Sequence, residues 1–178
     1  NIDELKETLN FSIRISIIAL LPATIGLMAI GLPIIQVLFE RGKFDTFASL
    51  LTNKALFYYV LGLPAFAITK IFANTFFSFQ DTKTPVKIAF AVMFVHVILC
   101  VALMKPLGVG GLALATSLCA YMNVFMLFYK LKQKIGKIGA RKILLSSIKA
   151  LIASTLMGII AYQIMQIKVL PVIIALVI

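Results

Sequence analysis

Long, nearly uninterrupted apolar runs are the feature that most constrains the fold of this 178-residue chain. A helix needs about 20 mostly apolar residues to cross the hydrocarbon core of a bilayer. The sequence offers five runs of about that length and a shorter sixth. The runs lack the two-residue alternation of transmembrane β-strands. A soluble fold that is 62% hydrophobic would expose large apolar patches. We therefore predict an all-α, polytopic transmembrane helix bundle.

Charged turns between the runs set the expected boundaries of the elements. The opening stretch mixes acidic and basic residues with apolar ones at helical spacing, which predicts a helix at the membrane surface. We expect an interfacial amphipathic helix over 1–14, followed by transmembrane helices over 15–39, 55–79, 86–104, 109–128 and 143–165 and a truncated one over 169–178. Between them we expect a periplasmic turn over 40–54, a cytoplasmic turn over 80–85 and a basic cytoplasmic loop over 129–142.

Three prolines lie inside the first two expected spans: Pro22, Pro33 and Pro64. A proline within a helix removes a backbone hydrogen bond and permits a kink. We expect these three positions to act as hinges.

The net charge of +11 indicates membrane topology rather than binding to nucleic acid. The lysines and arginines lie between apolar runs, and cytoplasmic loops of membrane proteins are rich in such residues. With 129–142 on the cytoplasmic side, most of the 17 basic residues fall on that side. The two cysteines, Cys100 and Cys119, lie inside apolar runs without a CxxC partner, so neither a disulfide nor a zinc site is expected.

Polar side chains at membrane depth form a first group of candidate functional residues. His96 and Cys100 are four residues apart on one helix face, and Thr116 and Asn123 are seven apart on another. An ionisable group inside a membrane is costly and suggests function. The sequence leaves three interpretations of the histidine open: a neutral ring bonded to a neighbouring helix, coupling to a cation or proton, or exposure to a water-filled cavity.

Two turns form a second group of candidates. Arg41 and Gly42 follow an apolar helix, where the arginine can meet lipid phosphate and the glycine gives a flexible backbone. Asp81 and Thr84 lie in the turn before the next helix, which Asp81 or Thr82 can cap. We place Arg41, Gly42, Asp81, Thr84 and Asn123 along a substrate or lipid pathway. The sequence holds no paired intramembrane carboxylates, HExxH or phosphate loop, so we expect a transporter and not an enzyme.

Four motifs, in order and in register, resemble those of the MurJ/MviN family. The first motif comprises Leu21-Pro22, Gly26-Leu27 and Leu38-Phe39-Glu40-Arg41-Gly42-Lys43-Phe44. The second is Gly62-Leu63-Pro64-Ala65, the third is the "QDTxTP" turn at Gln80–Pro85, and the fourth is the "GxALATS" helix at Gly110–Ser117. Together they cover about residues 20–117, and the later helices are compatible with the same pattern.

This resemblance implies a fragment of a fourteen-helix flippase of the MOP exporter superfamily. Such proteins move the peptidoglycan precursor lipid II across the bacterial inner membrane by alternating access. The implied partners are lipid II, membrane lipids and the N-terminal helices missing from this chain. The fifth span and the truncated sixth would form a groove for the lipid tail.

The family also carries a polar cluster proposed to bind sodium. At the matching positions, this sequence has His96, Cys100 and Thr116, of which only the threonine is a hard oxygen ligand. No cofactor or metal is implied, and coupling to sodium, to protons or to the membrane potential stays open.

Two other functions remain as alternatives. One is a related exporter of lipid-linked oligosaccharides or drugs, and the other is a membrane scaffold that does not transport.

Overall fold

The apolar runs form six α-helices in a computed structural model that describes residues 2–136 and 140–166. The helices are α1 (Ile2–Phe39), α2 (Thr46–Val60), α3 (Leu63–Ser78), α4 (Lys83–Leu107), α5 (Val109–Ile135) and α6 (Ala140–Gln166). Three of them are long and apolar enough to cross a membrane, and α2 and α3 together make a fourth, bent by 42°. A shorter apolar stretch, Leu145–Ala161, lies in α6. The truncated span expected over 169–178 lies outside the described residues.

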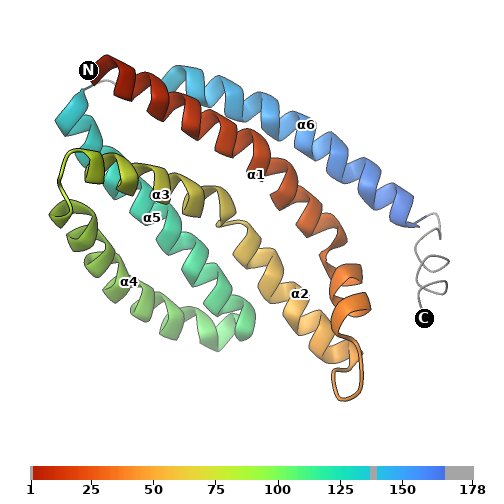
Figure 1. Cartoon of the computed structure of the whole chain (residues 1–178). Helices are drawn as coiled ribbons and strands as arrows, with labels where there is room; N and C mark the ends of the chain where they lie inside the picture. Colours follow the sequence, from red (N-terminus) through yellow and green to blue (C-terminus); the bar gives the residue numbers. More distant parts are fainter. Residues whose placement is uncertain (1, 137–139, 167–178) are drawn as a thin grey trace.

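Helix α5 lies between α4 and the bent α2–α3 pair (Figure 1). It packs against α2, α3 and α4, while α1 packs against α2, α3 and α6 (Figure 1). The buried core joins the first half of α1 to α3, α4 and the second half of α5. Its most buried members include Leu9, Phe76, Leu127 and Leu131.

The outer face of α4 carries large apolar side chains that are exposed in the described part of the chain. Phe90, Phe94, Val97, Ile98 and Val101 are all more than half exposed. In water such a surface would be an association site. In a bilayer this surface can contact lipid tails directly and needs no protein partner, because lipid tails are as apolar as leucine.

Several element boundaries differ from those expected. The interfacial helix over 1–14 and the span over 15–39 form one continuous helix, and both Pro22 and Pro33 lie inside it. The turn expected over 40–54 is shorter, since α2 begins at Thr46. There, the Asp45 side chain accepts a hydrogen bond from the Ala48 amide at 2.9 Å and caps the helix.

The basic loop expected over 129–142 is also mostly helical. Helix α5 continues to Ile135, so Lys130, Lys132 and Lys134 lie on its last turns. Cations at a helix C-terminus interact favourably with the helix dipole, and this helps the helix to continue. Likewise, α4 begins at Lys83 and includes residues that were expected in the turn over 80–85.

Candidate functional sites

The structure brings together the three residues considered for cation coupling. His96 Nε2 lies 3.1 Å from Thr116 Oγ1 and 3.4 Å from Cys100 Sγ. The His96–Cys100 pair follows from helical spacing, and the tight α4–α5 hairpin supplies Thr116. The Thr116 hydroxyl donates to the Leu112 carbonyl at 2.9 Å, so an oxygen lone pair is available to the ring. This geometry corresponds to the first of the three interpretations of His96, in which a neutral ring forms a hydrogen bond to a neighbouring helix.

A second site surrounds the turn between α3 and α4. Asp81 accepts hydrogen bonds from the Thr84 amide at 3.1 Å and the Thr84 hydroxyl at 3.0 Å, and it pairs with Lys134 at 2.9 Å. The Lys134 ammonium also lies 5.8 and 5.1 Å from the ring centroids of Phe76 and Phe79, within cation–π range. These contacts tie the end of α5 to the α3–α4 turn.

The hydrogen bonds to Asp81 favour its charged form. The bond from Lys134, followed by that from the Thr84 amide, holds the pKa of Asp81 below its ordinary value of 3.8. The preceding residue, Gln80, has a left-handed backbone with φ of 57°. The Asp81 amide bonds to the Phe76 carbonyl and the Gln80 amide to the Phe77 carbonyl, which together end α3 in a Schellman motif.

The break between α2 and α3 is a third site, and it lies next to Pro64. Proline cannot donate a backbone hydrogen bond, and Pro64 is at the start of α3. Side chains from α5 bind the carbonyls left free at the break. Ser117 donates to the Tyr58 carbonyl at 2.6 Å and Tyr121 to the Leu61 carbonyl at 2.8 Å. Sequence reasoning missed both residues, because only the fold shows that α5 faces the break.

The turn after α1 contains Arg41 and Gly42, which were predicted to lie on a lipid pathway. Arg41, Gly42 and Lys43 are exposed, and Gly42 has φ of 62°, which favours glycine. Glu40, which was not among the candidate functional residues, makes side-chain hydrogen bonds to the start of α2. Its carboxylate accepts from Thr46 Oγ1 at 2.7 Å and from the fully buried Ser49 Oγ at 3.1 Å. Glu40 therefore stabilises the start of α2, where a negative charge is favoured.

Asn123 lies on α5 with its side-chain oxygen buried and without a hydrogen-bond partner among the described residues. The same holds for side-chain oxygens of Asn10, Thr24 and Thr69. No substrate contact follows from this, so its place on a lipid pathway stays a prediction, as do those of Arg41, Gly42, Asp81 and Thr84.

A groove between α1 and α6 is a further feature that sequence reasoning did not find. One part has a volume of about 490 Å³ and is lined at one end by Arg14, Ser146 and Lys149, then by apolar side chains that include Pro22 and Met157. Arg14 Nε donates to Ser146 Oγ at 2.9 Å, which orients the guanidinium.

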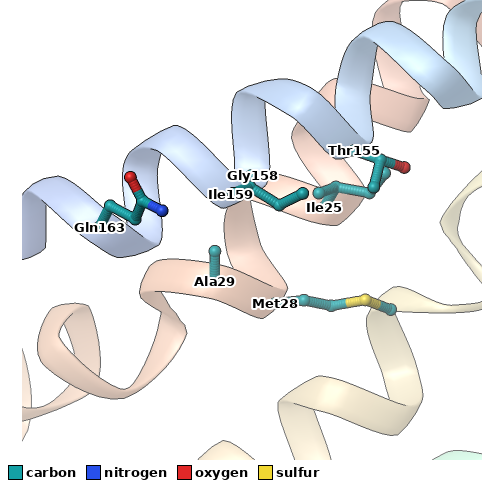
Figure 2. Close-up of a pocket in the computed structure, with 7 residues that line it drawn as sticks. All are labelled: Ile25, Met28, Ala29, Thr155, Gly158, Ile159 and Gln163. Carbon is teal, nitrogen blue, oxygen red and sulfur yellow. The ribbon is translucent and has the colours of Figure 1, made fainter.

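The groove has a second part, of about 520 Å³, farther along the same two helices. Ile25, Met28 and Ala29 of α1 line it together with residues of α6 that include Gly158 and Gln163, and Figure 2 shows Ala29 pointing toward α6 while Met28 extends to the side. A Cβ on Gly158 would lie 2.5 Å from Ile25 Cγ2, so the helices approach closely at this glycine. The two parts together form a surface that is basic at one end and mostly apolar along the rest, with Thr155 and Gln163 among its polar members.

Membrane-length helices and a broken span whose carbonyls accept hydrogen bonds from α5 define a multi-pass α-helical membrane protein. The family model described as lipid II flippase MurJ matches residues 1–177. The chain therefore belongs to the MurJ lipid II flippase family, a family of transporters and not of enzymes.

Individual relatives agree with this assignment. The chain is 38% identical over 152 residues to a probable lipid II flippase MurJ of Rickettsia prowazekii, covering 85% of this chain and 30% of that protein. It is 36% identical over 131 residues to one of Buchnera aphidicola, covering 74% and 26%. A solved structure titled "Lipid II flippase MurJ, inward closed conformation" matches with a TM-score of 0.76 and 27% identity over 91% of this chain and 38% of the other. The chain spans about a third or less of the curated relatives that it matches.

Proposed function

We propose that this chain supplies the C-terminal part of a lipid II flippase of the bacterial inner membrane, and that the α1–α6 groove holds the substrate's lipid tail. The observation that carries the proposal is the pairing of a basic end with an apolar groove. Arg14 and Lys149 suit a phosphate group, because guanidinium and ammonium groups form charge-assisted hydrogen bonds to it. The remaining lining suits a hydrocarbon chain.

The length of the groove also suits a lipid tail. Arg14 and Ala29 are fifteen residues apart on α1, which at 1.5 Å per residue is about 22 Å along the helix. The hydrocarbon core of a bilayer is about 30 Å thick. A chain in the groove would therefore run from the headgroup level through more than half of the core.

The orientation proposed for this protein places the segment 129–142 and the basic end of the groove at the cytoplasmic face. Lipid II is made at that face, according to the role that the family resemblance implies. Single cysteines introduced as Lys132→Cys and Lys43→Cys test the orientation. An impermeant thiol reagent added to intact cells should label the second and spare the first, and the reverse pattern would overturn it.

The function is tested in cells depleted of their own flippase and supplied with the full-length protein. Ala153→Phe and Ala29→Phe narrow the two parts of the groove, and Ala102→Phe adds the same ring to the outer face of α4 as a control. Arrival of labelled lipid II at the outer face should fall with the first two variants and not with the control.

Arg14→Gln with Lys149→Gln tests the basic end. Loss of a charge-assisted hydrogen bond is worth about 1.5–3 kcal/mol, so transport should fall about tenfold or more. A full-length protein that moves a different lipid-linked sugar or a drug, but not lipid II, would favour the related exporter. Absence of any vectorial transport would favour the scaffold.

A further inference from the structure

The basic end of the α1–α6 groove carries a set of hydrogen-bond donors suited to one anion. Arg14 of α1 and Lys149 of α6 both line this end. Arg14 Nε donates to Ser146 Oγ at 2.9 Å, which holds the guanidinium beside α6. A guanidinium has five N–H donors, so others remain for an anion, and the Ser146 hydroxyl can still donate its own proton.

The rest of this part of the groove has little with which to recognise a sugar or a peptide. Its other lining residues are Ile18, Pro22, Ala150, Ala153, Ser154 and Met157. The Ser154 hydroxyl already donates to the Ala150 carbonyl at 2.6 Å, and the other side chains are apolar. Binding sites fix a polar ligand with a few well-placed polar groups, and in the described part of the chain this groove has them only at its basic end. It can therefore recognise a phosphate and a hydrocarbon tail.

The charge of the basic end matches a phosphate monoester. Arg14 and Lys149 are both cations, and no aspartate or glutamate is among the described residues that line this part of the groove. A phosphate monoester carries a charge of about −1.5 to −2 at pH 7 and has three strong acceptor oxygens. The phosphodiester of a common phospholipid has only one ionisable oxygen, so it leaves one of the two cations without a counter-charge.

The shape of the groove favours a lipid with a single chain. The two helices touch along its floor, because Ser154 is 1% exposed and a Cβ on Gly158 would lie 2.5 Å from Ile25 Cγ2. One hydrocarbon chain can lie along the seam between two touching helices, whereas the second chain of a phospholipid would lie outside it. Arg14 and Pro22 are eight residues apart, which is about 12 Å along α1, so even a short prenyl chain reaches through the first part.

We infer that the groove also binds a polyprenyl phosphate that carries no sugar, with its phosphate at Arg14, Ser146 and Lys149 and its tail along the seam. The inference rests on the proposed assignment of the groove to a lipid tail. It goes beyond that assignment, because the sugar-free lipid then competes with the sugar-bearing one for the same site.

A second apolar pocket provides a matched control. It lies on α4, has a volume of about 420 Å³, and is lined by Val97, Ile98, Val101, Ala102 and Lys105. This pocket combines hydrocarbon with one cation, and no hydroxyl group is among its lining residues. A ligand that needs only an apolar surface and a lysine should bind there as well as in the groove.

The test uses the full-length protein in detergent and a farnesyl phosphate with a photoreactive diazirine on its tail. After irradiation, mass spectrometry should locate adducts in segments 14–22 and 146–157 and not in 97–105. Unlabelled farnesyl phosphate and lipid II should each displace the probe. Farnesol, which lacks the phosphate, and phosphatidylglycerol, a diester, should displace it at least about tenfold less well, because charge-assisted hydrogen bonds are lost.

Substitutions separate the phosphate from the tail. Arg14→Gln and Lys149→Gln should each reduce the adducts in the groove about tenfold, whereas Lys105→Gln on α4 should leave them unchanged. Equal displacement by farnesol and farnesyl phosphate would show binding of hydrocarbon alone, and equal displacement by phosphatidylglycerol would show a general site for anionic lipids. Either result would overturn the inference.

The same variants distinguish this inference from the proposed function. If the probe leaves the groove unlabelled while Ala153→Phe still lowers lipid II transport, the sugar-free ligand is wrong and the proposed function stands. If the probe labels the groove as expected while Ala153→Phe leaves transport unchanged, the groove is a lipid phosphate site outside the transport path, and the proposed function fails.

Discussion

Gly111→Ala is expected to force α4 and α5 apart. A Cβ added at Gly111 would overlap the Leu103 carbonyl oxygen and lie 2.5 Å from its carbon. Ordinary Cβ contacts begin near 3.4 Å, so the backbones must separate by about 0.9 Å or more. Backbone atoms cannot rotate away as a side chain can, and the whole helix pair must therefore adjust.

The energetic balance favours destabilisation. Alanine in place of a helical glycine gains up to about 1 kcal/mol in propensity. Overpacking costs about 1–3 kcal/mol, and a gap of 0.5–1 Å removes a quarter to a half of the attraction between each facing atom pair. We expect a net loss of about 2 kcal/mol in the free energy of unfolding. The 3.1 Å contact between His96 and Thr116 should also lengthen beyond hydrogen-bond range.

Gly26→Ala in α1 is the matched control. A Cβ there would meet only Met157 Cε, at the ordinary distance of 3.7 Å. This variant should be as stable as the parent or up to about 1 kcal/mol more stable. The assay is reversible unfolding of the full-length protein in mixed micelles, followed by circular dichroism. If Gly111→Ala proves as stable as Gly26→Ala, the close approach of α4 and α5 is refuted.

Three further substitutions test the turn and the helix break. Gln80→Gly should raise the free energy of unfolding by about 1 kcal/mol, because glycine adopts the left-handed backbone of that position without strain. Denaturation of the purified protein measures this free energy, and a decrease would contradict the Schellman geometry. Asp81→Asn should destabilise the protein at neutral pH. Because the pKa of Asp81 is lowered in the folded state, its contribution is present above its ordinary value and is lost as the pH falls through the lowered value. The difference between parent and variant should therefore disappear in acid, and a difference that persists there would refute a role for its charge. Ser117→Ala leaves the Tyr58 carbonyl without its hydroxyl partner and should cost about 1–3 kcal/mol, while Ser12→Ala on α1 serves as the comparison in the same unfolding assay.

Local spacing predicted the parts of the sites that belong to one helix. His96 and Cys100 meet because residues four apart share a face, and the helical class followed from the length of the apolar runs. Pro64 was expected to bend its span, and a break lies beside it. Its role as a moving hinge, like those of Pro22 and Pro33, stays a prediction.

Contacts between residues that are far apart in the sequence could not be predicted from the sequence alone. Lys134 pairs with Asp81 across 53 residues, and Ser117 bonds to Tyr58 across 59. Only the packing of α5 against α2, α3 and α4 creates these pairs. The early start of α2 carried a local signal, since Asp45 followed by a helical pattern is a recognisable N-cap. Arg14 and Lys149, in contrast, had no local signal that places them at one end of a groove.

The capped break between α2 and α3 has a consequence for how the chain enters the membrane during synthesis. The Tyr58 carbonyl leaves the ribosome 59 residues before Ser117, which at 5–20 residues per second is roughly 3–12 s. Bare carbonyls are not tolerated in hydrocarbon. The bent segment must therefore wait in a hydrated environment, such as the interior of the insertion machinery, until α5 arrives. The two segments are expected to partition into lipid as one unit.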